Sequence, residues 1–136
     1  GMSVAKYLWV AIVKYLRTLI KIFSNSDEWS EITVDELFDR VNSDQPPLLL
    51  DVRFAEEFND GYGHIQGARS IPILELKTKL EELDSFKDEE IVTMCPGGGM
   101  SLVAVDILTE AGFKDTKSLH GGTDLWNKSG YPTIKS

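Results

Sequence analysis

The sequence predicts an α/β fold with a central parallel sheet and helices on both faces. Three observations support this prediction. Short apolar runs typical of buried strands alternate with segments whose apolar residues recur at helical spacing. The segment Leu48–Val52 is almost entirely apolar, as in strands that helices cover on both faces. Glu90–Met94 is a β-prone run that a glycine-rich turn joins to a helical pattern.

The individual helices and strands follow from periodicity and from turn residues. Thr33 is a good N-cap for a helix over Val34–Val41, and residues 42–47 break that helix. After the strand at Leu48–Val52 we expect, in chain order, a strand ending at Ile71–Pro72, a helix over Pro72–Leu83, an acidic loop over Ser85–Glu90, a strand over Glu90–Met94, a helix over Ser101–Ala111, a strand over Lys117–Leu119, and a turn and helix over Gly121–Trp126. Ligands of such sheets bind at the carboxyl ends of the strands, which is where residue 95 falls.

The single cysteine of the chain lies where a strand is predicted to end and a helix to begin. Cys95 is followed by Pro96 and by the glycines Gly97–Gly99, which allow the backbone to fold closely around a small anion. Converging amide groups and the positive end of the next helix favour the thiolate, which is the nucleophilic form. The pattern therefore predicts a reactive Cys95. The alternative is a small buried hydrophobic residue.

Motifs spread over residues 48–136 resemble the rhodanese family of sulfurtransferases. They are, in chain order, Leu49-Leu50-Asp51-Val52-Arg53 with Glu57-Phe58, His64-Ile65-Gln66-Gly67-Ala68, Ser70-Ile71-Pro72, the loop that Cys95 opens, Ala111-Gly112-Phe113, and Leu119-His120-Gly121-Gly122 with Trp126, Gly130 and Pro132. The resemblance implies a rhodanese-like fold and a sulfurtransferase that carries sulfane sulfur as a persulfide on Cys95. It also implies two kinds of partner, a small-molecule or protein sulfur donor and a thiol acceptor.

The loop departs from the usual family pattern because it carries no charge. Its residues after the cysteine, which we expect to bind the substrate, are Pro96, Gly97, Gly98, Gly99, Met100 and Ser101. The loop is shorter than in the phosphatases and arsenate reductases that share the fold, and Met100 stands where a sulfurtransferase usually has arginine. A guanidinium gives a dianion charge-assisted hydrogen bonds that neutral amides do not replace, so we expect thiosulfate to be a poor donor. A neutral loop also fits an alternative, a catalytically weak or inactive interaction module.

Asp51, Arg53 and His64 are expected to support the loop. Asp51 and Arg53, at the end of a neighbouring strand, are expected to form an ion pair that orients it, and Glu57 could complete that pair. His64 is either an acid–base group or, as the family pattern implies, a structural residue in a turn. The sequence offers no cysteine–histidine cluster with metal-ligand spacing, so we expect neither a metal nor a cofactor.

Composition and charge indicate one globular domain with an appendage. The chain has 136 residues and a net charge of −8. Residues 1–26 contain four cations and no acid, so residues 27–136 carry −12, which argues against nucleic acid as a partner. We therefore expect a basic N-terminal helix over 1–26, with Gly1 as an expression scar, and a rhodanese-like domain over 27–136. A lone cysteine excludes an intrachain disulfide and indicates a reducing, cytoplasmic location.

Residues 4–23 are predicted to form a basic amphipathic helix. Its cations, which fall in one sector of the helix, are Lys6, Lys14, Arg17 and Lys21. Nearly all its other residues are apolar, and Trp9 suits the headgroup boundary of a membrane. The cations make it a poor transmembrane span, and no signal-cleavage site follows it. We expect its apolar face to be covered by peripheral contact with a membrane, by a second copy in a homodimer, or by its own domain.

Overall fold

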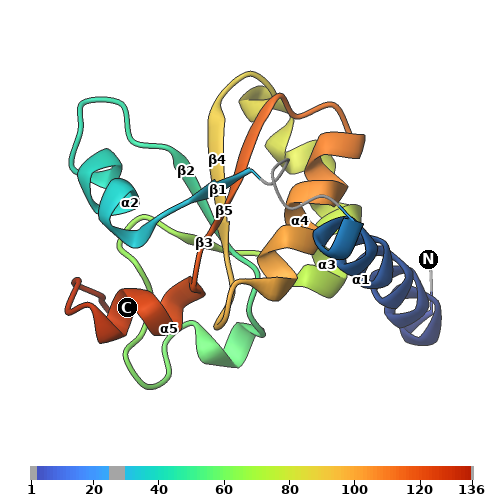
Figure 1. Cartoon of the computed structure of the whole chain (residues 1–136), viewed down its shortest axis with the longest axis horizontal. Helices are drawn as coiled ribbons and strands as arrows, with labels where there is room; N and C mark the ends of the chain where they lie inside the picture. Colours follow the sequence, from blue (N-terminus) through green and yellow to red (C-terminus); the bar gives the residue numbers. More distant parts are fainter. Residues whose placement is uncertain (1–2, 25–29, 136) are drawn as a thin grey trace.

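The computed structural model describes residues 3–24 and 30–135. Its elements are α1 (Val4–Ser24), β1 (Glu31–Ile32), α2 (Val34–Val41), β2 (Leu48–Asp51), the 3₁₀ helix η2 (Ala55–Glu57), β3 (Arg69–Ser70), α3 (Ile73–Leu76), the 3₁₀ helix η3 (Lys77–Phe86), β4 (Glu90–Met94), α4 (Gly99–Glu110), β5 (Asp115–Leu119) and α5 (Gly122–Lys128). The five strands form a parallel sheet in the order β1-β5-β4-β2-β3. Helices α2 and α5 cover one face, and α3 and α4 cover the other (Figure 1). The predicted α/β architecture is confirmed.

Alternating strand residues build a separate apolar core on each face of the sheet. Leu50 of β2 points into the cluster that includes Leu108 of α4. The neighbouring Leu49 points into the opposite cluster, with Leu37 of α2 and Trp126 of α5. Both faces of β2 are therefore buried, which explains why its sequence is apolar at successive positions instead of alternating.

Elements with strong local signals begin where the sequence predicts them. Thr33 caps α2: its Oγ accepts the amide proton of Glu36 at 3.1 Å, and the Glu36 carboxylate accepts the amide proton of Thr33 at 3.3 Å. This reciprocal capping box satisfies two amide groups near the helix start. Strand β4 spans the predicted residues Glu90–Met94.

The segment after β3 differs from the prediction of a single α-helix over Pro72–Leu83. The α-helix ends at Leu76, and the chain continues as the 3₁₀ helix η3 to Phe86, so the predicted acidic loop is shorter. Leu80, Leu83 and Phe86 all pack against the same apolar cluster. Their spacing of three matches the three residues per turn of a 3₁₀ helix, in which side chains at i and i+3 eclipse one another.

Two short elements were not predicted. Strand β1 consists of Glu31 and Ile32, which pair with Ser118 and Leu119 of β5, and η2 is a single turn after β2. A two-residue strand has no periodicity to detect, because its position depends on the partner strand. The predicted domain boundary, between residues 26 and 27, lies outside the described residues.

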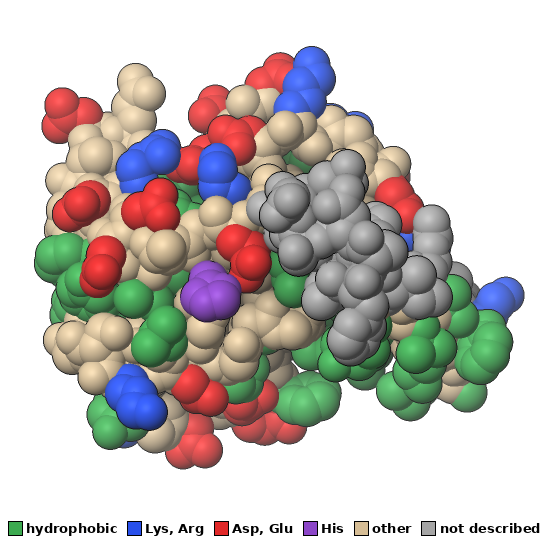
Figure 2. Space-filling view, in the orientation of Figure 1, with side chains coloured by type: hydrophobic (Ala, Val, Ile, Leu, Met, Phe, Trp, Pro, Cys, Tyr) green, Lys and Arg blue, Asp and Glu red, His purple; other side chains and the backbone are tan. Residues whose placement is uncertain are grey.

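Helix α1 lies on the outer side of α4 and α3 (Figure 1). Lys14 faces the domain: it is only 9% exposed and forms an ion pair with Glu110 at the end of α4. The exposed apolar residues in the described part of α1 include Val4, Leu8, Trp9, Ile12 and Leu16. Figure 2 shows hydrophobic side chains gathered where α1 projects from the domain. None of the helices in residues 3–24 and 30–135 has the length and apolar run that a membrane span needs.

Candidate functional site

Cys95 lies directly after β4, at the carboxyl edge of the sheet, and α4 begins four residues later at Gly99. Its side chain is 2% exposed. The loop closes through Gly98, whose φ of 97° lies in the left-handed region that glycine adopts without steric cost. The predicted arrangement of strand, tight glycine turn and helix is therefore present.

Two backbone amides point at the sulfur of Cys95. The N–H groups of Gly98 and Ser101 donate to Sγ at nitrogen–sulfur distances of 3.1 and 3.3 Å. The Ser101 hydroxyl lies 3.4 Å from the same sulfur. Both amides belong to the first turn of α4 or to its N-cap, where the helix leaves amide groups without intrahelical partners. Backbone amides in this arrangement are hydrogen-bond donors of the kind that bind anions at helix N-termini.

Buried hydroxyl groups hold Ser101, one of the two amide donors, in position. The hydroxyls of Ser101 and Ser118 are 2.7 Å apart, and the Thr93 hydroxyl donates to the Ser101 carbonyl at 2.8 Å. All three residues are completely buried. Sequence reasoning missed Ser118 and Thr93, although two buried strand residues with hydroxyl groups next to a nucleophile loop are a usable signal.

The first turn of α5 anchors the other side of the loop. The amides of Thr123 and Asp124 donate to the carbonyls of Cys95 and Pro96 at 2.9 and 3.0 Å. Gly122 makes this approach possible: a Cβ there would lie 2.2 Å from the Cys95 carbonyl oxygen. Two glycine-dependent turns, one on each side, therefore fix the backbone around the sulfur.

The ion pair expected between Asp51 and Arg53 is formed and buried. Arg53 donates from Nε to Oδ1 of Asp51 at 2.9 Å and from Nη2 to Oδ2 at 2.7 Å, and Nη2 also donates to the Gly63 carbonyl at 2.9 Å. Burial alone would lower the pKa of Arg53, but the hydrogen bonds and negative charge of Asp51, with the charges of Glu57 and Asp124, raise it above its ordinary value. The guanidinium therefore links Asp51 to the turn that contains Gly63.

Glu57 and His64 also have structural contacts. The Glu57 carboxylate accepts the amide proton of Phe54 at 3.1 Å and so caps η2. The His64 ring stacks on Phe58 with centroids 3.6 Å apart, and its Nδ1 lies 2.8 Å from the Phe58 carbonyl oxygen. The backbone of His64 pairs with Ile134. These contacts match the interpretation of His64 as a structural residue in a turn.

Met100 and α1 shape the outer side of the loop. Met100 is partly buried and packs against the apolar cluster on the α4 face of the sheet. A Cβ on Gly99 would meet the Tyr15 ring of α1 at 3.9 Å, which is ordinary van der Waals contact. Helix α1 therefore reaches the start of α4, next to Met100.

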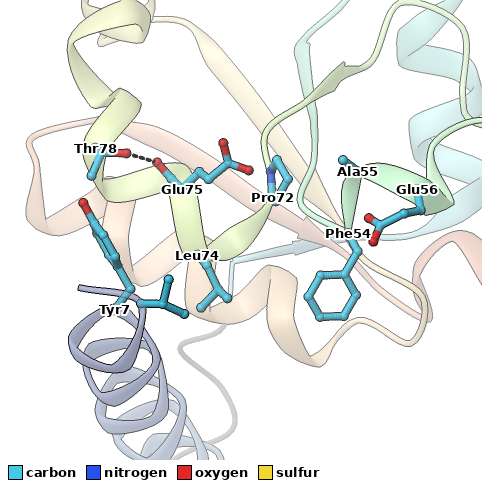
Figure 3. A pocket seen from close by; sticks show the side chains of 9 residues that line it. Tyr7, Phe54, Ala55, Glu56, Pro72, Leu74, Glu75 and Thr78 are labelled. Carbon is cyan, nitrogen blue, oxygen red and sulfur yellow. Dashed lines mark hydrogen bonds between the residues drawn. The ribbon is translucent and has the colours of Figure 1, made fainter. Parts of the chain in front are cut away.

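An apolar cavity of about 390 Å³ opens between α1 and the domain (Figure 3). Its apolar lining includes Tyr7 of α1, Leu74 of α3 and Phe54 of the segment that precedes η2. The charged residues in its lining are Glu56 and Glu75, which are both acidic. A cavity of this size and lining suits an apolar group and disfavours an anion.

The chain matches known proteins over most of its length. The family profile of the rhodanese-like domain matches residues 33–129. The chain is 35% identical to thiosulfate sulfurtransferase 16 of Arabidopsis thaliana over 94 residues, which are 62% of this chain and 77% of that protein. It is also 35% identical to the putative sulfurtransferase YtwF of Bacillus subtilis over 99 residues, 73% of this chain and 91% of that protein. Four other relatives are longer, and the chain spans between 22% and 53% of their length.

A solved structure agrees with these matches. The crystal structure of a rhodanese-related protein from Thermoplasma volcanium superposes with a TM-score of 0.70 at 28% identity, over 79% of this chain and all of that one. The parallel sheet, the loop after β4 and the matching relatives lead to one conclusion: the chain belongs to the rhodanese-like domain family.

Proposed function

We propose that the chain is a sulfurtransferase that carries sulfane sulfur as a persulfide on Cys95. The observation that carries the proposal is the cradle around the sulfur, in which Gly98 and Ser101 donate amide protons to Sγ. Relatives at 35% identity are named sulfurtransferases, which supports the same reaction class. In this role Pro96–Ser101 would bind the transferred sulfur, while Asp51, Arg53 and His64 would support the loop from outside.

The proposed reaction has two balanced half-reactions. In the first, the Cys95 thiolate attacks the outer sulfur of a donor, a new S–S bond forms, and the donor leaves with the electron pair of the broken bond. In the second, the thiolate of an acceptor attacks the outer sulfur of the persulfide, and Cys95 leaves as a thiolate. The amides of Gly98 and Ser101 would stabilise the negative charge in both resting forms.

The charges near the loop favour a donor that is not a dianion. The loop has no cation, and Arg53 is bound to Asp51 and to the Gly63 carbonyl. The charged residues that line the apolar cavity beside α1, Glu56 and Glu75, are acidic. We therefore propose an uncharged, apolar or weakly charged persulfide donor, with thiosulfate a poor substitute.

The competing function is an interaction module that does no chemistry. The uncharged loop with Met100 favours it. The apolar face of α1 is exposed and open to a contact under either function. We propose that this face contacts either a second copy of the chain or a membrane surface. Such a contact is compatible with either function, so it does not decide between them.

Intact-mass spectrometry separates the two functions. Full-length protein incubated with a panel of persulfide donors should gain one sulfur atom that reductant removes, and Cys95→Ser should gain none. Circular dichroism of both proteins is the control for folding. If a folded wild-type protein gains no sulfur from any donor, the interaction module is the better account.

A further inference from the structure

The hydroxyl group of Ser101 lies between the sulfur of Cys95 and a second hydroxyl, that of Ser118 on β5. Its oxygen is 3.4 Å from Sγ and 2.7 Å from Oγ of Ser118. A further neighbour of the Ser118 oxygen is the carbonyl oxygen of Gly98, 3.5 Å away. Ser101 and Ser118 are completely buried, so their hydroxyl protons need partners within the protein.

This row of groups allows two arrangements, because each hydroxyl has one proton to donate. When Cys95 is a thiol, its S–H donates to Ser101 and the Ser101 hydroxyl donates to Ser118. The Ser118 hydroxyl then donates to the Gly98 carbonyl. When Cys95 is a thiolate, the row reverses, so that Ser118 donates to Ser101 and Ser101 donates to the sulfur. No proton passes along the row in this change: the thiol proton is released to solvent, and the two O–H bonds rotate.

The distances favour the arrangement that ends on a charged sulfur. The thiol arrangement needs a weak S–H donor at 3.4 Å and a hydrogen bond from Ser118 to Gly98 that is close to the limiting length at 3.5 Å. The thiolate arrangement keeps the short bond of 2.7 Å and directs an O–H group at an anion, where a hydrogen bond is stronger. The anion also polarises the Ser101 hydroxyl, which makes its oxygen a better acceptor for Ser118.

We propose that Ser118 is a positioning residue for the reaction of Cys95: it donates to the Ser101 hydroxyl and so directs that hydroxyl at the sulfur when the sulfur is negatively charged. The hydroxyl becomes a third donor to Sγ, beside the amides of Gly98 and Ser101. The proposal rests on the sulfur-transfer function, in which Cys95 is a thiolate before it attacks the donor and again when it leaves from the acceptor. Ser118 acts through Ser101, because the short hydrogen bond joins these two hydroxyls.

The charged and titratable groups around the loop are the same in every variant used to test this role. Asp51 and Arg53 follow β2 and are paired with each other. Asp124 belongs to the first turn of α5, and Tyr15 of α1 lies near Gly99. Within the described residues, the groups that form hydrogen bonds with Sγ are all uncharged. A difference between variants at the hydroxyls therefore reports on the hydroxyls.

The pH dependence of thiolate formation tests the role of Ser118 without a sulfur donor. The ultraviolet absorbance of the thiolate is followed against pH in the full-length protein, with Cys95→Ser subtracted as background. Ser101→Ala should move the midpoint upward by about one pH unit, because it removes a hydrogen bond to the charged sulfur. Ser118→Ala should move it in the same direction by about half a unit, because the Ser101 hydroxyl loses the donor that directs it.

Two further variants separate a role through Ser101 from the general effect of losing a buried hydroxyl. Thr116→Val removes a hydroxyl two residues earlier on β5, where Thr116 is 5% exposed and its oxygen lies 3.1 Å from the Thr109 hydroxyl of α4. This control should leave the midpoint unchanged. The double variant Ser101→Ala with Ser118→Ala should have the midpoint of Ser101→Ala alone, because Ser118 then has no hydroxyl to direct. Circular dichroism checks that each variant is folded.

Three results would overturn the role of Ser118. They are an unchanged midpoint in folded Ser118→Ala, a shift of the same size in Thr116→Val, and a full effect of Ser118→Ala in the Ser101→Ala background. Sulfur uptake by the wild-type protein, measured by intact mass, is a separate readout. If the midpoints shift as expected in a protein that never gains sulfur on Cys95, the sulfurtransferase is overturned and the role of Ser118 in forming the thiolate stands.

Discussion

The Cys95 loop and helix α1 both contact α4, but they differ in how completely their groups are partnered. In the loop, the sulfur receives two amide protons, and the carbonyls of Cys95 and Pro96 accept protons from α5. In α1, Lys14 is turned toward the domain and paired with Glu110, while Trp9 is 66% exposed. The backbone of the loop is thus held in a fixed geometry around the sulfur. Helix α1 instead leaves an apolar surface available to something outside the domain.

The largest effect on stability is expected from the buried ion pair between Asp51 and Arg53. Asp51→Asn would leave the Arg53 guanidinium buried without its charge partner, and we expect a loss of about 3–5 kcal/mol in the free energy of unfolding. Chemical denaturation measures this loss. Asp84→Asn is the matched control, because the carboxylate of Asp84 is 66% exposed in its pair with Lys87, and it should cost less than about 1 kcal/mol. Equal effects from the two variants would show that the buried pair does not stabilise the fold.

The approach of α5 to the loop gives the next largest effect. Gly122→Ala places a Cβ 2.2 Å from the Cys95 carbonyl oxygen at a φ of +66°, so we expect it to cost about 3 kcal/mol of stability and to slow sulfur uptake. Gly97→Ala is the control, since a Cβ there meets no atom within 4 Å in the described part of the chain. A stable Gly122→Ala protein with normal sulfur uptake would mean that this contact does not position the loop.

The missing cation can be restored in a third experiment. Met100→Arg should raise kcat/KM for thiosulfate, because a guanidinium would then face the dianion. The gain in transition-state stabilisation should be at most about 1.5–3 kcal/mol, the contribution of a charged hydrogen bond. Met100→Leu, which adds no charge, should leave it unchanged. If Met100→Arg has no more effect than Met100→Leu, charge is not what limits thiosulfate as a donor.

Sedimentation and liposome flotation show what the exposed apolar face of α1 binds. A homodimer should sediment as a dimer without lipid, whereas a membrane-associated protein should float with anionic liposomes and detach at high salt. Replacing Trp9 and Ile12 together by Gln should abolish whichever contact exists, with Cys95 reactivity retained. A monomer that ignores liposomes would contradict both alternatives and leave packing on its own domain as the explanation of α1.

Features that depend on neighbours in the chain could be predicted from the sequence, and those that depend on distant contacts could not. The cap of α2 at Thr33 and the glycine turn after Cys95 follow from local geometry, so they appear at the predicted residues. The position of β1 depends on pairing with β5, and the 3₁₀ form of η3 depends on packing against the core. Which side of α1 faces the domain could not be predicted either, because it depends on Glu110 lying within reach of Lys14.

The same distinction applies to the candidate site. Cys95 and its glycines are adjacent in sequence, so their arrangement could be predicted. Ser118 approaches Ser101 from another strand, and Thr123 and Asp124 reach the loop from α5. Residues of this kind are brought together only by the sheet topology, and the sequence alone gives each of them an ordinary surface or strand position.

An isotope pulse-chase follows a single sulfur atom onto Cys95 and away from it. A persulfide donor with a heavy sulfur isotope is mixed with the full-length protein, and an acceptor thiol is added after the excess donor has been removed. Mass spectrometry follows the label over time. Our account predicts that the label is found first on the peptide containing Cys95 and then moves to the acceptor at the rate at which that peptide loses it. Label that reaches the acceptor without ever residing on Cys95, or that stays on the protein when the acceptor is in excess, would contradict the account.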